Sequence, residues 1–382
     1  MNLLYITEDY TASKVSHMLL MNELKQRRDL TAYVVCPIRD KNRKSLVTSY
    51  QTHERLIAVC KEIDVSPRRY KLDFAERVRC KIRMIEQNVP MAEIDLIHAA
   101  TLYSDGAVAY KLSQKYGIPY FVTARSADLK TYTQKLFYLW PLANRIISHA
   151  SDIVTVTAVI KDALIRNWRY LPSKGKLANS LVLGNGIDDI WLNNLHLGQR
   201  HIGNAVKVLF IGRFDNNKNA LNLIEAVLRL QQRIDISLTM IGGNGEFHDD
   251  VLRLVNQHGD RLTYAGEIYD KAKLMRVVRQ HDIFAMVSHR ETFGLVYAEC
   301  LSQGLPILYS CGTGFYGMYP EGFVGYGANS RSVPSIAESL ERIIGNYDQI
   351  SSNVASLDFG RFTWSAIARE YMKLYDKHAH LA

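Results

Sequence analysis

The feature that most constrains the fold is a regular alternation of short apolar runs with segments of helical period. Apolar runs lie at 3–7, 32–37, 96–100, 120–124 and 153–157, and again at 208–212, 236–243, 262–266, 283–288 and 306–310. Segments of helical period, such as 15–26, 106–116, 219–233 and 250–257, lie between them. Buried strands that alternate with helices are typical of parallel sheets covered by helices on both faces. The chain is therefore predicted to be an α/β protein with two Rossmann-like, doubly wound domains.

The length of the chain and one polar stretch predict where the domains meet. A chain of 382 residues is long enough for two domains that each bury a core. Residues 188–205 are polar and weakly periodic, so they are predicted to form the linker after a first domain at 1–190. The carboxyl ends of the two sheets are expected to face each other across a cleft, where ligands bind in such folds.

Positive charge is concentrated in the first half of the chain. Residues 1–195 hold 28 Lys and Arg against 19 Asp and Glu, whereas residues 196–382 hold 19 of each. This imbalance indicates that the first half meets an anionic partner. A helix is predicted to begin at Ser66-Pro67, with basic residues beside an apolar stripe of Tyr70, Phe74, Val78 and Ile82. Two interpretations stay open: the helix lies on an anionic membrane surface, or its stripe faces the core.

Several classes of protein are excluded by what the sequence lacks. No apolar run reaches the roughly 18 residues of a membrane span, and the first residues have no secretory-signal pattern. Zinc-finger and RRM patterns are missing, so nucleic acid is not expected as a partner. The five cysteines are scattered and odd in number, which is typical of reduced thiols. A cytoplasmic protein is predicted, peripheral on the inner membrane face if the basic helix lies on lipid.

The most informative segment for function is 283–306. Glu291 follows a predicted strand, and Glu299 lies eight residues later on a helix that begins near Gly294. Backbone N–H groups of Gly294 and Leu295 would point at a bound anion, and glycine lets that anion approach closely. The two carboxylates can accept hydrogen bonds from sugar hydroxyls. The segment therefore suits a nucleotide diphosphate that carries a sugar.

Two further loops follow predicted strands. Arg213 and Lys218 come after Gly212, and two cations beside a helix start can neutralise a diphosphate as it leaves. Such loops are common, so this loop alone is weak evidence for a diphosphate site, and it becomes strong evidence only together with the Glu291 segment. Gly243 lies in a glycine-rich turn that either lines the donor site or simply reverses the chain.

Together these segments resemble the retaining glycosyltransferases of the GT-B fold, in glycosyltransferase family 4 (glycosyl transferases group 1). ETFGLVYAE at 291–299 matches the E-x7-E motif of that family, and GRFDNNKN at 212–219 matches its Gly-Arg-x4-Lys loop. Segments at 94–106, 116–129, 181–188 and 362–375 resemble other parts of the family. The resemblance implies an acceptor-side domain at 1–190, a nucleotide-sugar domain at 206–360, and a C-terminal helix at 361–382 that crosses back to the first domain.

The resemblance also implies roles for single residues. The catalytic residues would be Glu291, Arg213 and Lys218, with Glu291 on the sugar hydroxyls and the two cations on the phosphates. Substrate contacts are expected from Glu299, Phe293, Gly294, Leu295, Arg125, Ile268 and Gly243. Retention is explained in this family by attack of the acceptor hydroxyl from the face that the leaving phosphate vacates. No D-x-D metal motif occurs, so neither a metal nor another cofactor is expected.

The sequence departs from the family at two positions on the acceptor side. The loop at 8–14 has no glycine, where many relatives have two. Arg125 stands where relatives often have histidine, and it is either a contact to sugar or phosphate or a structural arginine. His98 ends a predicted strand and is interpreted as structural rather than as a ligand contact.

These observations predict a retaining, metal-independent hexosyltransferase of cell-surface polysaccharide synthesis. A UDP sugar is the favoured donor and a GDP sugar the alternative, and the acceptor is expected to be a glycan or a lipid-linked glycan. Two other functions stay open: a non-catalytic partner protein that keeps the GT-B fold, and a GT-B sugar-nucleotide epimerase.

Overall fold

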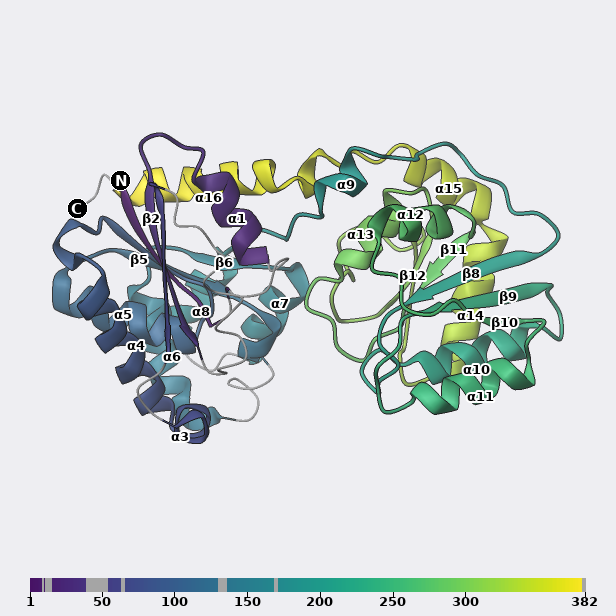
Figure 1. Ribbon diagram of the computed structural model, residues 1–382, viewed down its shortest axis with the longest axis horizontal. Coiled ribbons are helices and arrows are strands. Elements are labelled where there is room, and N and C mark those ends of the chain that lie inside the picture. Colours follow the sequence, from purple (N-terminus) through teal and green to yellow (C-terminus); the bar gives the residue numbers. More distant parts are fainter. Residues whose placement is uncertain are drawn as a thin grey trace. The chain divides into compact units, whose positions relative to one another are not determined.

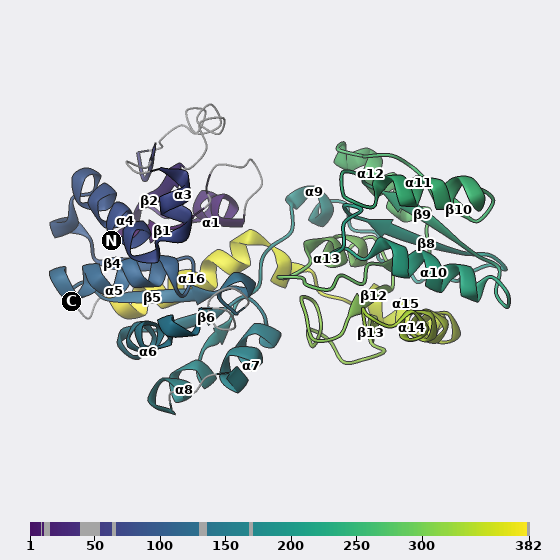
Figure 2. The same ribbon diagram turned by 90° about the horizontal axis from the view of Figure 1, so that it is seen from below.

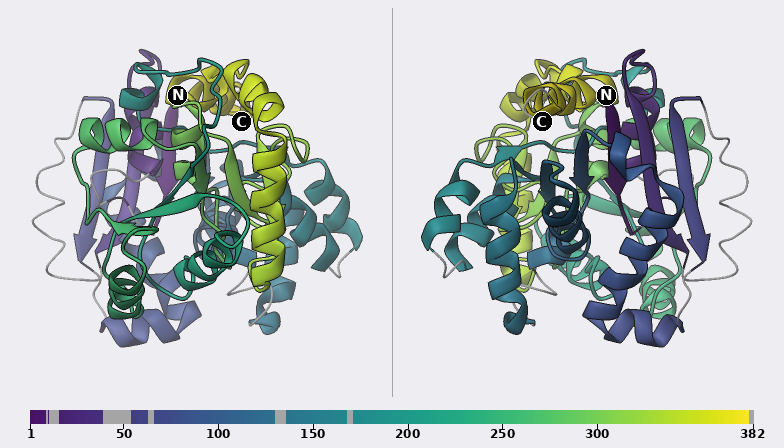
Figure 3. Two further views of the ribbon diagram at one scale, coloured as in Figure 1. Left: turned by 90° about the vertical axis from the view of Figure 1, so that its right-hand side faces the viewer. Right: turned by 90° about the vertical axis from the view of Figure 1, so that its left-hand side faces the viewer.

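The computed structural model describes residues 1–8, 10, 16–38, 54–62, 66–129, 136–167 and 171–379. The chain divides into two compact units, the first made of residues 1–185 with 364–382 and the second of residues 186–363. Each unit contains one parallel sheet with helices on both faces (Figure 1 and Figure 3). The predicted α/β fold with two doubly wound sheets is confirmed.

The sheet of the first unit reverses its strand order at β1. Among the described residues it has seven strands in the order β3-β2-β1-β4-β5-β6-β7, and all neighbours are parallel. The strands are β1 (Asn2–Ile6), β2 (Thr31–Ile38), β3 (Leu56–Glu62), β4 (Leu96–Ala99), β5 (Tyr120–Ala124), β6 (Ile153–Thr155) and β7 (Leu181–Val182). Along β1, Leu3 and Tyr5 join one core cluster, while Leu4 and Ile6 join another. Both faces of the sheet are therefore buried.

Helices cover both faces of this sheet. On one face α1 (Ser16–Leu24) and α16 (Trp364–Ala379) lie side by side (Figure 2). The other face is covered by α4 (Phe74–Asn88), α5 (Ser104–Tyr116), α6 (Trp140–His149), α7 (Ala158–Asn167) and α8 (Leu171–Ala178). The remaining short elements are α3 (Pro67–Leu72), η2 (Met91–Glu93) and η4 (Phe137–Leu139).

The second unit has one core that surrounds its sheet. Among the described residues its strand order is β10-β9-β8-β11-β12-β13, again all parallel. The strands are β8 (Val206–Ile211), β9 (Ile236–Ile241), β10 (Leu262–Tyr264), β11 (Ile283–Ala285), β12 (Ile307–Ser310) and β13 (Gly325–Ala328). The helices are α9 (Asp189–Leu192), α10 (Ala220–Leu230), α11 (His248–Gln257), α12 (Lys271–Arg279), α13 (Leu295–Leu301), α14 (Val333–Gly345), α15 (Tyr347–Ala355) and η5 (Gly360–Phe362).

Three strands were not predicted, and all three lie at sheet edges. These are β3, β7 and β13. An edge strand has only one neighbour and is less completely buried, so its sequence need not be a continuous apolar run. The outward residues of β3 include Lys61 and Glu62, both residues of β7 are exposed, and β13 is half glycine.

Residues 188–205, predicted as a linker, are instead part of the second unit. Asp188 caps α9, because its carboxylate accepts the N–H of Ile190 at 3.2 Å. Trp191 follows and is only 1% exposed in the core of this unit. Ile190, Leu192, Leu197 and Ile202 also pack on this core, but they do not recur at a regular helical spacing, and polar residues surround them in the sequence.

The C-terminal helix α16 belongs to the first unit and begins at Trp364 rather than at residue 361. The hydroxyl of Tyr375 lies 3.0 Å from Nδ1 of His98. Near its end, Lys377 and His378 bind the carboxylate of Asp152 at 2.9 and 2.6 Å. Buried aromatic packing and these ion pairs hold α16 on its sheet.

The basic segment after residue 66 forms two helices instead of one. Ser66 accepts the N–H of Arg69 at 3.3 Å, which confirms the predicted helix start. Asp73 ends α3 and caps α4 by accepting the N–H of Glu76 at 2.9 Å. Tyr70 and Val78 of the apolar stripe are buried, so the stripe faces the core and not a membrane.

Among the described residues, no helix has the length and apolar character needed to cross a bilayer.

Candidate functional site

Gly294 shapes the turn between β11 and α13. Its φ of 81° is in the left-handed region, where a side chain is strained. A Cβ atom on Gly294 would lie 2.4 Å from the ring of Tyr297 and 3.2 Å from Cγ of Glu291. Glycine is therefore favoured here, because a larger residue would be strained at this φ, would clash with the Tyr297 ring and would press on the Glu291 side chain.

Glu291 is held by a residue that the motifs did not indicate. The hydroxyl of Thr313 accepts the backbone N–H of Glu291 at 2.7 Å and donates to its carbonyl at 2.9 Å. Behind it, a Cβ atom on Gly314 would lie 2.7 Å from Cβ and Cγ of Glu291. Thr313 and Gly314 thus clamp Glu291 from the loop after β12, and no local sequence signal identifies them.

The loop after β8 contacts this glutamate directly. Nζ of Lys218 lies 2.7 Å from Oε2 of Glu291, and both side chains are mostly buried. Asp215 joins the two predicted cations: it accepts the backbone N–H of Lys218 at 2.8 Å and pairs with Arg213 at 2.5 Å. Arg213 remains 72% exposed, so its guanidinium is accessible to a ligand. The structure therefore brings Arg213, Lys218 and Glu291 together and adds Asp215.

Asparagines connect the same two loops. Nδ2 of Asn217 donates to the carbonyl of Arg290 at 3.0 Å, and the N–H of His289 donates to the carbonyl of Asn217 at 2.8 Å. Nδ2 of Asn219 donates to the carbonyl of Val287 at 3.1 Å. Hydrogen bonds thus connect the loop that contains Lys218 to the segment just before Glu291. The asparagine-rich sequence DNNKN was the available signal for this role.

The remaining predicted residues of α13 differ in exposure. Phe293 is buried in the core of the second unit, whereas Leu295 and Glu299 are half-buried. Glu299 lies on the middle turn of α13, and its carbonyl accepts the hydroxyl of Ser302 at 2.6 Å. The side chain of Phe293 therefore belongs to the core, and a contact between its backbone and a ligand stays a prediction.

Gly243 and Ile268 lie on adjacent loops after β9 and β10. A Cβ atom on Gly243 would lie 3.0 Å from Oε1 of Glu267, which also accepts Nδ2 of Asn244 at 2.6 Å. Tyr269 donates its hydroxyl to the other oxygen of Glu267. Ile268 packs on the core. The four loops after β8, β9, β10 and β11 thus bring these residues to the carboxyl end of the second sheet, where such folds bind ligands.

Arg125 lies in the first unit, just after β5. Its backbone N–H donates to Asp128 at 2.8 Å, and its Nε donates to the carbonyl of Ala100 at 3.0 Å. His98 is buried nearby, with its ring nitrogens at 2.8 Å from Thr123 and 3.0 Å from Tyr375. Burial, and then the charge of Arg125, hold the pKa of His98 well below its usual range. His98 is thus a neutral, fully hydrogen-bonded structural residue.

Two other expectations concern the loop at 8–14 and a metal. Most of that loop lies outside the described residues, which include only Glu8 and Tyr10. In the part of the chain that the structure describes, no three His, Cys, Asp or Glu side chains come close enough to hold a metal ion. Independence from metal stays a prediction.

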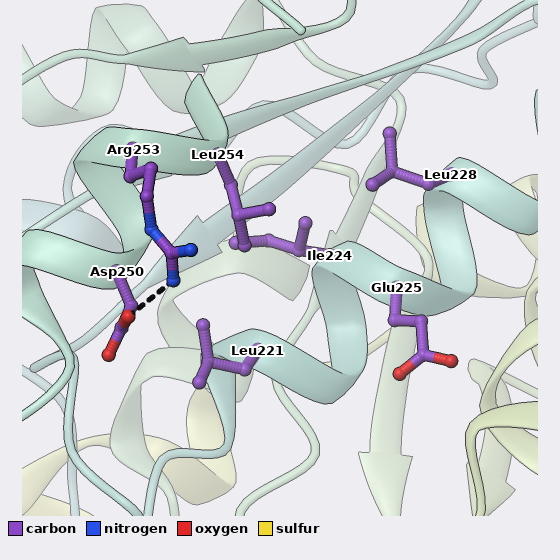
Figure 4. Close-up of a pocket in the computed structure, with 7 residues that line it drawn as sticks. All are labelled: Leu221, Ile224, Glu225, Leu228, Asp250, Arg253 and Leu254. Carbon is purple, nitrogen blue, oxygen red and sulfur yellow. Dashed lines mark hydrogen bonds and ion pairs between the residues drawn. The ribbon is translucent and has the colours of Figure 1, made fainter. Parts of the chain in front are cut away.

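A separate groove of about 330 Å³ lies between α10 and α11 (Figure 4). Leu221, Ile224 and Leu228 line it from α10, and Leu254 lines it from α11. Its charged residues are already paired, such as Asp250 with Arg253 at 2.6 Å. None of the predicted site residues lines this groove, so it is distinct from the site at the loops.

Comparison with known proteins adds family relationships to this geometry. Residues 17–189 match the family model "Glycosyltransferase Family 4", and residues 198–354 match "Glycosyl transferases group 1". The chain is 24% identical over 239 residues to an uncharacterized glycosyltransferase, MJ1607, of Methanocaldococcus jannaschii, and this match spans 59% of each protein. It is 22% identical over 316 residues to a phosphatidyl-myo-inositol mannosyltransferase of Mycobacterium leprae, spanning 80% of this chain and 79% of the relative.

A solved structure of similar fold is that of Alr3699/HepE from Anabaena in complex with UDP and glucose. It aligns with 99% of this chain and 100% of its own, with a TM-score of 0.67 and 18% sequence identity. At 18% identity the structural similarity supports a shared fold and nothing further. The fold is GT-B, as the motifs implied.

Proposed function

Because this chain belongs to glycosyltransferase family 4, we propose that it transfers a hexose-type sugar from a nucleotide-diphosphate sugar with retention of configuration. A UDP sugar is the favoured donor and a GDP sugar the alternative. The acceptor is a glycan or a lipid-linked glycan in the synthesis of cell-surface polysaccharide. The complex of HepE with UDP and glucose supports the choice of UDP.

The observation that carries the proposal is the contact between Lys218 and Glu291, with Arg213 joined through Asp215. Nζ of Lys218 lies 2.7 Å from Oε2 of Glu291 and neutralises its charge. A bound diphosphate would share Lys218 and recruit the exposed Arg213, which leaves Glu291 to accept sugar hydroxyls. The two cations then stabilise the negative charge that grows on the leaving phosphate.

The transfer itself needs positioning more than an enzymic nucleophile. The bond from the anomeric carbon to the phosphate oxygen breaks, the acceptor oxygen bonds to that carbon from the same face, and the hydroxyl proton passes to the leaving phosphate. In this scheme Glu291 orients the sugar, and the Thr313 clamp keeps Glu291 in place. No metal is needed in this scheme, because Arg213 and Lys218 supply the positive charge.

Association with an anionic membrane surface is part of the proposal, through the exposed face of α3 and α4. Arg69, Arg79 and Arg83 surround the buried Glu76 at 3.6, 2.8 and 3.3 Å, which leaves a local excess of two positive charges. Leu72 is 71% exposed on the same short segment. Each basic residue near anionic lipid adds about 1 kcal/mol of attraction. The mannosyltransferase relative supports a lipid acceptor, because its name specifies phosphatidyl-myo-inositol.

A thermal-shift panel of UDP, GDP, ADP, CDP and TDP, with and without magnesium, tests the donor. A ligand at 100 times its dissociation constant adds about 2.7 kcal/mol of stability, so one nucleotide should stand out. The same shift with and without magnesium would support a metal-independent site. No shift with any nucleotide would contradict a donor site and favour the non-catalytic alternative.

The Glu291→Gln variant tests the site. It should keep nucleotide binding but reduce hydrolysis of the donor sugar on the order of a hundredfold. Glu225→Gln, at an exposed position on α10, is the control with the same change of charge. Full activity of Glu291→Gln would refute the assignment, and an epimerised sugar nucleotide as product would favour the epimerase.

Sedimentation with vesicles that contain or lack anionic lipid tests the association with an anionic membrane surface. Equal binding to both kinds of vesicle would reject that association.

A further inference from the structure

Arg125 carries a guanidinium that is only partly used within the protein. Its Nε donates to the carbonyl of Ala100 at 3.0 Å, and its backbone N–H donates to Asp128 at 2.8 Å. Among the residues that the structure describes, the terminal Nη1 and Nη2 atoms have neither a hydrogen-bond nor an ion-pair partner. The side chain is half-buried. Four N–H groups thus remain available on a cation that is partly removed from water.

The groups around this cation do not neutralise it. Its charge acts on Tyr5, His17, His98 and Tyr371. Burial, and then Arg125, hold the pKa of both histidines well below the usual range. Burial raises the pKa of both tyrosines, against the opposing effect of Arg125. All four groups are therefore neutral at neutral pH, and none compensates the positive charge.

Three described carboxylates near this sheet edge, Glu8, Asp105 and Asp128, have other partners. Glu8 lies 2.5 Å from Nζ of the fully buried Lys81, which also pairs with Asp105. Asp128 accepts backbone N–H groups of Arg125 and Tyr103, at 2.8 and 3.1 Å, rather than the guanidinium. Within the part of the first unit that the structure describes, the buried Lys81 is thus paired with carboxylates, whereas Arg125 has no counter-ion.

Arg125 also lies where a doubly wound sheet binds its ligands. The strand order reverses at β1, and β4 is its neighbour on the side toward β5. The Nε atom of Arg125 reaches from the end of β5 to Ala100 at the end of β4, and the N–H of Ala100 donates to Ile6 of β1 at 2.9 Å. The crevice at the carboxyl ends of strands, beside such a reversal, is the usual ligand site.

We propose that Arg125 binds an anionic group of the acceptor, a phosphate or a carboxylate, so that the acceptor is itself negatively charged. This inference rests on the proposed function. A planar guanidinium whose two terminal nitrogens have no partner among the described residues matches two oxygens of either group. The donor diphosphate is assigned to Arg213 and Lys218 in the second unit, so the anion at Arg125 is assigned to the acceptor. A phosphorylated lipid carrier and a glycan with uronic acid residues both provide this chemistry.

The test uses the full chain and simple anions. The double variant Arg213→Gln/Lys218→Gln removes the two cations of the proposed donor site, so that anions do not bind there. In this background, glycerol 1-phosphate and glucuronate are titrated and their binding is followed by saturation-transfer NMR. Arg125→Gln is then added, with Arg125→Lys as the conservative variant. Arg145→Gln, on the exposed surface of α6, is the control with the same change of charge.

We expect at least one anion to bind, and Arg125→Gln to weaken it on the order of tenfold or more. Arg125→Lys should keep part of the affinity, because it retains the positive charge but cannot bind two oxygens at once as a planar guanidinium can. Arg145→Gln should have no effect. Preference for glycerol 1-phosphate would indicate a phosphorylated acceptor, and preference for glucuronate a uronic acid. Equal binding without Arg125, or no binding of either anion, would overturn the proposal. Unchanged near-ultraviolet circular dichroism will show that the variants remain folded.

A second measurement separates this inference from the proposed function. The nucleotide shift is compared between the otherwise wild-type chain and its Arg125→Gln variant. An unchanged shift supports an acceptor role for Arg125. A smaller shift would overturn that role and assign Arg125 to the donor, while the proposed function stands. If no nucleotide binds the wild-type chain, the proposed function fails and an anion at Arg125 is not that of an acceptor.

Discussion

Replacing Thr313 with valine removes a hydroxyl and keeps the shape of the side chain. The Glu291 backbone then loses two hydrogen bonds, one from its N–H at 2.7 Å and one to its carbonyl at 2.9 Å. Gly314 still packs behind the Glu291 side chain. The perturbation therefore loosens the orientation of Glu291 without changing a charge or a predicted ligand contact.

The size of the effect follows from these two contacts. Each hydrogen bond contributes a net of about 1 kcal/mol, and Glu291 is only partly exposed, so water replaces the hydroxyl incompletely. We expect the free energy of unfolding to fall by about 1–3 kcal/mol. If the same energy is lost from the transition state, turnover should fall by about 5- to 160-fold, because 1.36 kcal/mol corresponds to a factor of ten.

Hydrolysis of the donor sugar by water provides the assay, since it needs no identified acceptor. In Thr313→Val we expect a lower kcat, with the nucleotide dissociation constant changed by less than about twofold because the proposed phosphate ligands, Arg213 and Lys218, are untouched. Thr313→Ser keeps the hydroxyl and should restore kcat. A Ser variant as slow as the Val variant, or a Val variant with normal kcat and reduced stability, would refute a positioning role.

Three other predictions concern stability. Gly294→Ala should lower the free energy of unfolding by about 1–3 kcal/mol in urea denaturation, because a residue with φ of 81° would contact Tyr297, and an unchanged value would mean that the turn relaxes. Lys81→Met leaves Asp105 buried without its cation and should cost about 3–5 kcal/mol in the same measurement, with part of the loss recovered when Asp105→Asn is added; no recovery would contradict the ion pair. Burial raises the pKa of Asp128 to about 6, so folding favours its protonated form, and that contribution to stability is lost as pH rises from about 4 through 6. Asp128→Asn should reduce this loss in thermal unfolding measured between pH 4 and 7, and an identical pH profile would contradict the assignment.

The fold was predictable wherever strands are buried on both faces. Central strands such as β1 and β8 contain continuous apolar runs, at 3–6 and 208–211, and the helices between the strands have an amphipathic period. The edge strands β3, β7 and β13 were missed, although the edge strand β10 was predicted, because one side of an edge strand has no neighbour and tolerates charge or glycine. The position of the linker was wrong because burial of Trp191 depends on a distant core, which a polar composition does not indicate.

The sequence by itself determined which residues could carry the chemistry. The E-x7-E spacing and the Gly-Arg-x4-Lys loop are local, since each lies within one connection from a strand to a helix, and they predict Glu291, Arg213 and Lys218 as site residues. Only the tertiary structure decided their partners. Lys218 meets Glu291 across 73 residues of chain, and Thr313 meets it across 22.

The same holds for Arg125 in the first unit, whose contact with Ala100 spans 25 residues. Contacts of this kind form because parallel strands bring the loops at their carboxyl ends to one edge of a sheet. The periodicity of a sequence predicts each strand, but the order of strands in the sheet decides which loops become neighbours. The choice of Glu291 was therefore local, whereas its clamp, and the absence of a counter-ion for Arg125 among the described residues, are properties of the folded chain.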